Sequence, residues 1–183
     1  MAAAMQELAR GGVDAVRVEP LAVSLGVSKG SFYWHFRDRA DLLAELLADW
    51  ERGATASVIA LVDASSDDPE ARLAELLRVT TAAPEAPDVE LAIRGWGARD
   101  PAVRARLARI DERRERYVQG LIEAVGVPRQ EAKHRARALY LALIGEYARV
   151  AHGGAPTSRA TWMALLERML DGGRSSPGRR RSR

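Results

Sequence analysis

Residues 18–36 have the sequence VEPLAVSLGVSKGSFYWHF, which predicts two short helices joined by a tight turn. Four apolar residues in this stretch follow the spacing of one helix face: Val18, Leu21, Ala22 and Leu25. Gly26 is the residue type that accepts the left-handed conformation after a helix end, and Ser28 is placed to cap the helix that follows. Two apolar-faced helices with a glycine turn between them are the parts of a helix-turn-helix.

The second predicted helix has two unlike sides. At about 100° per residue, Phe32 and Phe36 lie on one side, where they should face the core. The other side and its flanks carry five residues: Lys29, Gly30, Ser31, Tyr33 and Trp34. Such a side suits a nucleic-acid groove, because glycine lets the backbone approach closely while basic, hydroxyl and aromatic side chains reach phosphates or base edges. The alternative is a helical hairpin whose aromatic residues pack on a neighbouring helix.

The rest of the sequence also predicts helices. Apolar patterns with the helical period cover most of the chain, and no period-2 pattern predicts a strand. Asp68-Pro69 and Asp100-Pro101 each place a capping carboxylate before a proline that can open a helix. A short helix is expected between Pro87 and Gly97, and a long one begins after Pro128. The sequence therefore predicts an all-α fold of about nine helices.

The composition argues against several functional classes. The chain has no cysteine, which removes disulfides, thiolate catalysis and cysteine-based zinc sites. Its three histidines lack metal-ligand spacing: His35, His134 and His152. Because no nucleophile elbow, phosphate-binding loop or zinc-binding helix motif occurs either, we expect no enzyme, no metal site and no cofactor. No apolar run is long enough to cross a bilayer and no signal peptide is recognisable, so we expect a cytoplasmic protein.

The positive charge of the chain is concentrated near its last residues. Residues 174–183 hold five arginines and no acid, and without them the formal net charge falls from +3 to −2. This composition predicts a disordered basic tail over residues 173–183, with extra attraction to DNA phosphate as the alternative.

Residues 26–36, GVSKGSFYWHF, together with Arg39 and the pair Leu42-Leu43, resemble the signature of the tetracycline-repressor (TetR) family. The resemblance is confined to the N-terminal head. It implies that four residues of the second helix lie at the DNA: Lys29, Ser31, Tyr33 and His35. It implies that Arg39 meets the DNA backbone at the start of the fourth helix. It also implies that four apolar residues hold the head together: Leu21, Val27, Phe32 and Phe36.

Two features depart from the family pattern. Arg17 stands where the family usually has a threonine that caps the second helix, so this cap is absent or supplied elsewhere. The first helix begins at Met1, without the family's earlier turns and basic arm, and little phosphate-neutralising charge remains. We therefore expect the natural protein to begin upstream of Met1. The missing arm also motivates the alternative of a helical ligand-binding or partner-binding protein that does not bind DNA.

The resemblance implies a chain of two parts and a tail. Residues 1–44 would form a three-helix DNA-binding head, residues 45–172 a helical effector-binding and dimerisation body, and residues 173–183 the tail. The protein would be a homodimeric repressor that binds a palindromic double-stranded DNA operator and is released by a small-molecule effector. The sequence identifies neither the operator nor the effector, and it does not distinguish repression from activation.

Five residues on or beside core-facing stripes are candidates for the effector pocket: Trp50, Trp96, Arg114, Tyr117 and Tyr140. The four aromatic residues resemble the lining of the cavity that the family builds between its middle helices, and ordinary core packing is the alternative. Arg114 lies in line with Ile110 and Tyr117 at the edge of the core. There it would extend to solvent, pair with a buried acid or meet a ligand.

The last two helices, from Pro128 to Leu170, are the candidate dimer interface. They carry more apolar area than one body is expected to bury, including Leu139, Leu143, Trp162, Leu166 and Leu170. An isologous interface would pack the two helices of each chain into a four-helix bundle.

Overall fold

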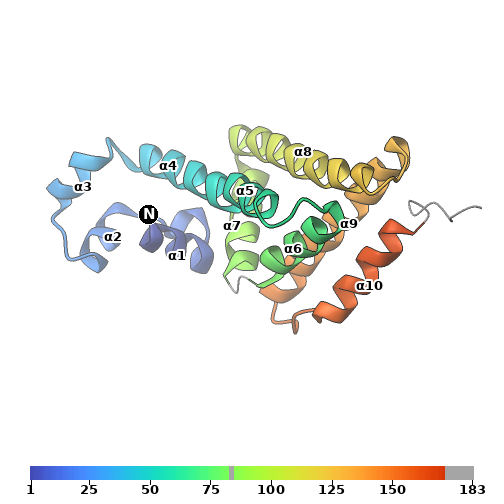
Figure 1. The fold of residues 1–183 in the computed structure, drawn as a ribbon. Helices are drawn as coiled ribbons and strands as arrows, with labels where there is room; N and C mark the ends of the chain where they lie inside the picture. Colours follow the sequence, from blue (N-terminus) through green and yellow to red (C-terminus); the bar gives the residue numbers. More distant parts are fainter. Residues whose placement is uncertain (83–84, 172–183) are drawn as a thin grey trace, which may run out of the picture.

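The structure of the protein is a computed structural model that describes residues 1–82 and 85–171, apart from the side chain of Lys29. The described residues form helices and no strand, as predicted (Figure 1). The helices are α1 (Ala2–Gly11), α2 (Val18–Ser24), α3 (Lys29–His35), α4 (Arg39–Glu51), α5 (Val58–Asp63), α6 (Pro69–Ala82), α7 (Ala86–Arg99), α8 (Pro101–Ala124), α9 (Arg129–Ala151) and α10 (Arg159–Leu170). None of these described helices is long and apolar enough to cross a membrane. The predicted tail, residues 173–183, lies outside the described residues.

The helix-turn-helix forms as the sequence predicts. Gly26 has a φ of +65°, and the N–H of Val27 donates to the carbonyl of Ala22 at 3.0 Å, which closes the end of α2. The hydroxyl of Ser28 accepts a hydrogen bond from the backbone N–H of Ser31 at 3.1 Å and caps α3. Arg17 makes no side-chain hydrogen bond at the start of α2, so the cap that a threonine would supply is absent.

Two apolar residues of the turn are exposed, contrary to the sequence prediction. Leu25 is 58% exposed and Val27 is 41% exposed, whereas Leu21 and Phe32 are buried. α2 ends before both exposed residues, so they no longer follow its apolar face. The head is therefore held together by Leu21 and Phe32, with Phe36 partly buried against the same core.

Arg39 fastens the start of α4 to the head. Its Nε donates to the carbonyl of Val16 at 2.7 Å, and one Nη donates to the carbonyl of Val13. Both carbonyls lie between α1 and α2, where Val13–Ala15 form a 3-10 turn. Asp38 caps the same helix by accepting a hydrogen bond from the N–H of Asp41 at 2.8 Å.

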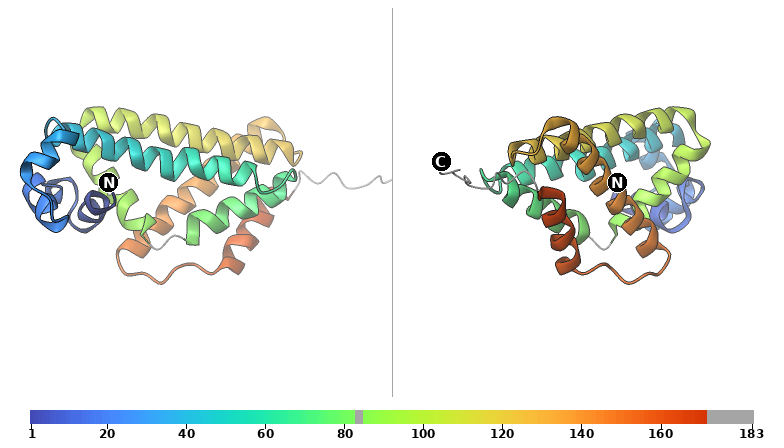
Figure 2. Two further views of the ribbon diagram at one scale, coloured as in Figure 1. Left: turned by 60° about the vertical axis from the view of Figure 1, so that its left-hand side comes forward. Right: turned by 90° about the vertical axis from the view of Figure 1, so that its right-hand side faces the viewer.

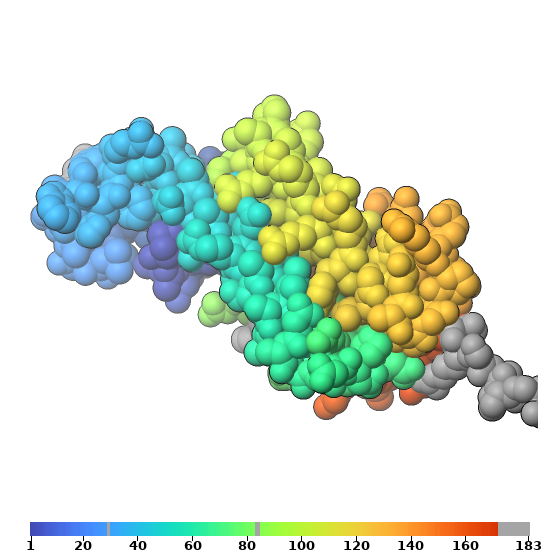
Figure 3. Space-filling view, turned by 45° about the horizontal axis from the view of Figure 1, so that its top comes forward, coloured from blue at the N-terminus to red at the C-terminus, as the bar shows by residue number. Residues whose placement is uncertain are grey.

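A π-helical segment, Arg52–Ser57, joins α4 to α5, and the three run on as one long helix that leaves the head and lies beside α8 (Figures 2 and 3). Arg106 of α8 donates to Glu51 at 2.8 Å, and Tyr117 of α8 donates to Asp63 of α5 at 2.8 Å. With α4 to α5 counted as one helix, the described residues contain nine helices, which is the predicted number.

Two apolar cores stabilise the fold. The first contains Leu8 of α1, Leu21 of α2 and Leu46 of α4, together with Ile93 of α7 and Leu107 of α8. The second is built from α6, α8, α9 and α10. The boundary expected between residues 44 and 45 therefore falls inside α4, and the head shares its core with α7 and α8.

α7 is longer than the sequence predicts. The helix expected between Pro87 and Gly97 runs from Ala86 to Arg99, because proline fits the first turn of a helix and Gly97 continues it. Gly97 is buried against α8, and a Cβ atom at this position would lie 2.6 Å from Cδ1 of Leu107. The glycine therefore allows two helices to approach closely and does not end α7.

Alanine substitutions at Gly97 and Gly95 distinguish the effect of this close packing on stability from the effect of helix propensity. Alanine favours a helix over glycine by about 1 kcal/mol at either position. At Gly97 the new methyl group must displace the buried Leu107, whereas no atom lies within 4 Å of the Cβ position of Gly95. We expect Gly97→Ala to be less stable than Gly95→Ala by about 1–3 kcal/mol in urea unfolding of the full chain. Equal stabilities would contradict the close contact between α7 and α8.

Candidate nucleic-acid interface and internal cavity

α3 lies at the end of the head that is farthest from the body (Figure 1). It exposes five of the residues singled out in the sequence: Gly30, Ser31, Tyr33, Trp34 and His35. Tyr33 is 46% exposed and Trp34 is 87% exposed, whereas Phe32 is buried and its ring centre lies 5.1 Å from that of Phe36. The predicted two-sided helix is therefore present. The side chain of Lys29 lies outside the described residues.

A cavity of about 440 Å³ lies in the body, between the helix formed by α4 and α5 and helices α6, α7, α8 and α9. This volume is in the range of small-molecule sites. Four of the five residues predicted for a pocket line it: Trp50, Arg114, Tyr117 and Tyr140. Trp96 does not, contrary to the prediction. It lies near the C-terminal end of α7, which packs on α1, and its side chain is partly buried against the first core.

Most of the cavity wall is apolar. The aliphatic lining includes Val58, Ile59, Leu76, Leu77, Val89, Val118, Leu139 and Leu143. Met5 of α1, in the head, lines the cavity. Trp50 also lines it and lies near the C-terminal end of α4, the helix that begins at Arg39. The cavity therefore adjoins the core that the head shares with the body.

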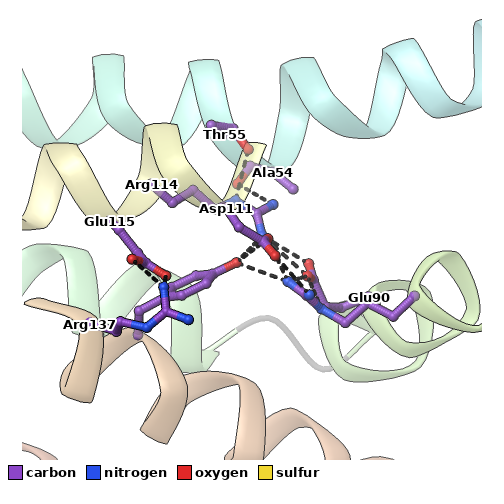
Figure 4. A network of polar contacts seen from close by, with 9 residues as sticks. Ala54, Thr55, Glu90, Asp111, Arg114, Glu115 and Arg137 are labelled. Carbon is purple, nitrogen blue, oxygen red and sulfur yellow. Dashed lines mark hydrogen bonds and ion pairs between the residues drawn. The ribbon is translucent and has the colours of Figure 1, made fainter. Parts of the chain in front are cut away.

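Arg114 is the centre of a polar network on this wall (Figure 4). Its Nε donates to Oγ1 of Thr55 at 2.9 Å, and its Nη1 lies 3.2 Å from each carboxylate oxygen of Glu90. Its Nη2 donates to the carbonyl of Ala54 at 3.3 Å. The guanidinium carbon lies 5.1 Å from the centre of the Trp50 ring, which is a cation–π distance. Of the alternatives that the sequence left open for Arg114, the structure has it paired with a buried acid.

Arg94 completes the network. It donates to Glu90 at 2.9 Å and to the two oxygens of Asp111 at 2.8 and 3.1 Å. The hydroxyl of Tyr140 donates to Asp111 at 2.6 Å and accepts from Arg94 at 2.9 Å. Two guanidinium groups thus face two carboxylates, and the formal charges of the network balance.

Burial and pairing act in opposite directions on the two arginines. Burial lowers the pKa of each, but hydrogen bonds and charge interactions with Asp111 and Glu90 outweigh it, so the pKa of Arg94 and that of Arg114 are raised. Burial raises the pKa of Tyr140 to about 12. All three groups therefore keep their protons at neutral pH.

The sequence singled out Arg114 and Tyr140 but missed the partners that hold them. Glu90 and Arg94 are four residues apart on α7, and Asp111 and Arg114 are three apart on α8. Both spacings bring opposite charges to one face of a helix. Acid–arginine pairs at these spacings beside apolar stripes are the signal that could have found the network.

Four of the five residues predicted for a dimer interface are buried within the chain itself, contrary to the prediction. Leu139, Trp162, Leu166 and Leu170 are 2–5% exposed and belong to the second core. The apolar area that seemed surplus in the sequence is covered by α6 and α8. Leu143 is partly buried and lines the cavity.

No cluster of three or more potential metal ligands occurs in the part of the chain that the structure describes. His35, His134 and His152 are each exposed: His35 lies on α3, whereas His134 and His152 lie more than four turns apart on α9 and directly after its end.

A helical fold that carries a helix-turn-helix, with an aromatic and polar side of its second helix open to solvent, defines a DNA-binding protein of the helix-turn-helix class. Residues 1–46 match the family of bacterial regulatory proteins described as the tetR family. The head of the chain therefore carries the N-terminal domain of this family, and the protein is a DNA-binding regulator of transcription.

The fold of the whole chain is similar to the crystal structure of a proposed transcriptional regulator from Pseudomonas aeruginosa PAO1. The TM-score is 0.70 at 20% sequence identity, and the likeness covers 93% of this chain and 86% of that chain. At this identity the comparison supports the fold alone. No curated protein matches the chain.

The polar network predicts that two neighbouring arginines contribute very differently to the free energy of unfolding. Arg114→Ala removes one of the two arginine partners of the buried Glu90, together with the donor to Thr55. Because breaking a buried pair costs about 3–5 kcal/mol and Arg94 still pairs with Glu90, we expect a loss of about 2–4 kcal/mol. Arg113 is exposed, and Arg113→Ala should change stability by less than about 0.5 kcal/mol. Urea unfolding of the full chain measures both values. A similar, small effect of the two substitutions would show that the network does not hold the cavity wall.

Proposed function

We propose that this regulator is a homodimeric repressor that binds a palindromic operator and leaves it when a small molecule fills the cavity. The observation that supports this most is the position of the cavity beside the head. Met5 of α1 and Trp50 of α4 line the cavity, and both side chains also pack in the core that the head shares with α7 and α8. A molecule in the cavity would therefore contact the core of the head directly.

α4 is the element through which such a molecule would act. Trp50, near its last residue, lines the cavity, while Asp38 and Arg39 fix its first turn beside the helix-turn-helix. Because α4 is one uninterrupted helix, displacement of Trp50 would move its other end and the attached α3. The ligand would thus favour dimers whose two α3 helices no longer match the spacing of the DNA grooves.

On the DNA side, we propose that α3 enters the major groove, with the two copies about 34 Å apart in the dimer. The proposed DNA contacts are Lys29, Gly30, Ser31, Tyr33, Trp34 and His35. We assign Arg39 a positioning role instead, because its guanidinium group already bonds to the carbonyls of Val13 and Val16. The head (residues 1–44) and the body (residues 45–172) are proposed as functional parts that share one core.

We propose that the dimer forms through the outer faces of α9 and α10, which contact each other on the side of the body away from α4 and α5 (Figure 2). α9 exposes Ala138, Leu141 and Gly145, whose spacing places them on one helix face, and Leu141 is 55% exposed. α10 exposes Ala164. Small residues around one leucine allow the close approach of a second pair of helices in a four-helix bundle.

The DNA contact is tested by titrating the full chain with the DNA that flanks its own gene and measuring fluorescence anisotropy. Tyr33→Ala should weaken binding to every fragment by roughly tenfold and leave its salt dependence unchanged, because a neutral phenol contacts phosphate without releasing counterions. Trp34→Ala should instead change which base substitutions in the operator are tolerated. Arg113→Ala, on the exposed side of α8, is the control and should bind as the unaltered chain does.

Two results would argue against this part of the proposal. Unchanged affinity for Tyr33→Ala would show that α3 is not the recognition helix. No binding of the unaltered chain to any fragment would favour a helical ligand-binding or partner-binding protein.

The dimer surface is tested with a matched pair of leucines. Leu141→Glu places a charge on the outer face of α9 and should give monomers in sedimentation at micromolar concentration, because the charge would be buried unpaired. Leu61 of α5 is 52% exposed, and Leu61→Glu should leave the dimer intact. A monomeric unaltered chain, or a dimeric Leu141→Glu variant, would exclude this interface.

A further inference from the structure

The buried charged and hydroxyl side chains around the cavity are already hydrogen-bonded within the protein. In residues 1–82 and 85–171, the only buried side-chain nitrogen or oxygen without a hydrogen-bond partner is Nε1 of Trp162, which does not line the cavity. The Arg114 network occupies the donors and acceptors of one wall. The hydroxyl groups of Tyr117 and Tyr147 donate to protein oxygens at 2.8 and 2.7 Å. A ligand would therefore meet no buried charged or hydroxyl group that lacks a hydrogen-bond partner, and the indole N–H of Trp50 remains as a neutral donor.

The buried charges of the wall are also balanced before a ligand enters. Glu90 is 3% exposed and lies between Arg94 and Arg114. An anionic ligand would add a third negative charge to two guanidinium groups that already face two carboxylates, and it could bind one of them only by displacing Glu90 or Asp111 from it. A cationic ligand would likewise add a third positive charge, and it could bind Glu90 or Asp111 only by displacing an arginine that already pairs with that carboxylate.

Two further carboxylates line the cavity but are solvated. Asp49 pairs with Arg52 at 3.2 Å, with 42% of its side chain exposed, and Glu85 is exposed. Exposed charges of this kind contribute little to the binding of a cation, because water screens them.

We infer that the cavity accepts a neutral, predominantly apolar molecule and discriminates against organic anions and cations. This inference rests on the proposed function, in which the cavity is the effector site. The aliphatic and aromatic wall supplies affinity by burying apolar surface. The saturated Arg94–Glu90–Arg114–Asp111 network supplies the discrimination, because it offers a charged ligand no partner.

Two fluorescent probes that differ by one sulfonate group test this directly. N-phenyl-1-naphthylamine is neutral, and 8-anilinonaphthalene-1-sulfonate is its anionic counterpart. Titration of the full chain should show one neutral probe bound per chain and at least tenfold weaker binding of the anion. Methyltriphenylphosphonium, an apolar cation, should displace the neutral probe only at concentrations at least tenfold higher than those needed by triphenylmethane, a neutral competitor with the same three phenyl rings.

Cavity-filling variants establish where the probes bind. Val58 of α5 lines the cavity, so Val58→Trp should weaken binding of the neutral probe at least tenfold. Leu61 lies on the same helix, is 52% exposed and does not line the cavity, so Leu61→Trp should bind as the unaltered chain does. Circular dichroism of both variants is the control for folding. Glu90→Gln should narrow the gap between the neutral and the anionic probe, because the two arginines then face one carboxylate.

The outcomes separate this inference from the proposal on which it rests. If the neutral probe does not bind, or if it binds Val58→Trp and Leu61→Trp equally well, the cavity is not a ligand site. This result would overturn both the inference and the proposed function. If the anion or the cation binds as tightly as the neutral probe, and if this binding is lost in Val58→Trp, the cavity is a ligand site. This result would overturn the charge discrimination alone. If Glu90→Gln does not fold, the comparison of the neutral, anionic and cationic probes on the unaltered chain still tests the charge discrimination.

Discussion

The buried ion pair between Arg114 and Glu90 is the interaction around which the body is arranged. Arg114 belongs to α8, Glu90 to α7, and the same guanidinium group holds Ala54 and Thr55 of the π-helical segment. These elements cannot separate without removing the guanidinium group of Arg114 from its buried partners, and breaking a buried ion pair is costly. A wider helical turn also opens backbone carbonyls to side chains, and Arg114 bonds to one of them. The cavity is the space that this interaction keeps open between the helices.

The sequence was informative where the controlling residues lie within one or two turns of each other. Gly26 and Ser28 determine how α2 ends and α3 begins, and the inward side of α3 follows from the spacing of Phe32 and Phe36. The same reasoning failed for Gly97, because a glycine that lets another helix approach looks the same in the sequence as one that ends a helix. Local chemistry predicts helix ends well, and it contains no information on what packs against them.

For the same reason the sequence could not assign the apolar faces to their partners. Trp162 and Leu166 have the spacing of a buried stripe, but whether α6 of the same chain or a second chain covers them depends on the tertiary arrangement. Trp96 and Trp50 both lie on inward stripes, yet only Trp50 reaches the cavity, because Trp96 lies where α7 meets the head. Glu90 was missed because an acid inside an apolar stretch shows its role only when Arg114 is seen beside it.

The first core limits how this regulator can evolve. Leu8 of α1 and Leu46 of α4 pack with Ile93 and Leu107, so the DNA-reading head and the helices around the cavity are not interchangeable modules. A head cut after residue 44 and joined to an unrelated body would leave Leu8 against water or against a surface of the wrong shape. Substitutions in α7 that adapt the cavity to a new molecule also alter the packing beneath the head. In the proposed function, recognition of DNA and recognition of a ligand would therefore change together, through compensating pairs of substitutions across that core.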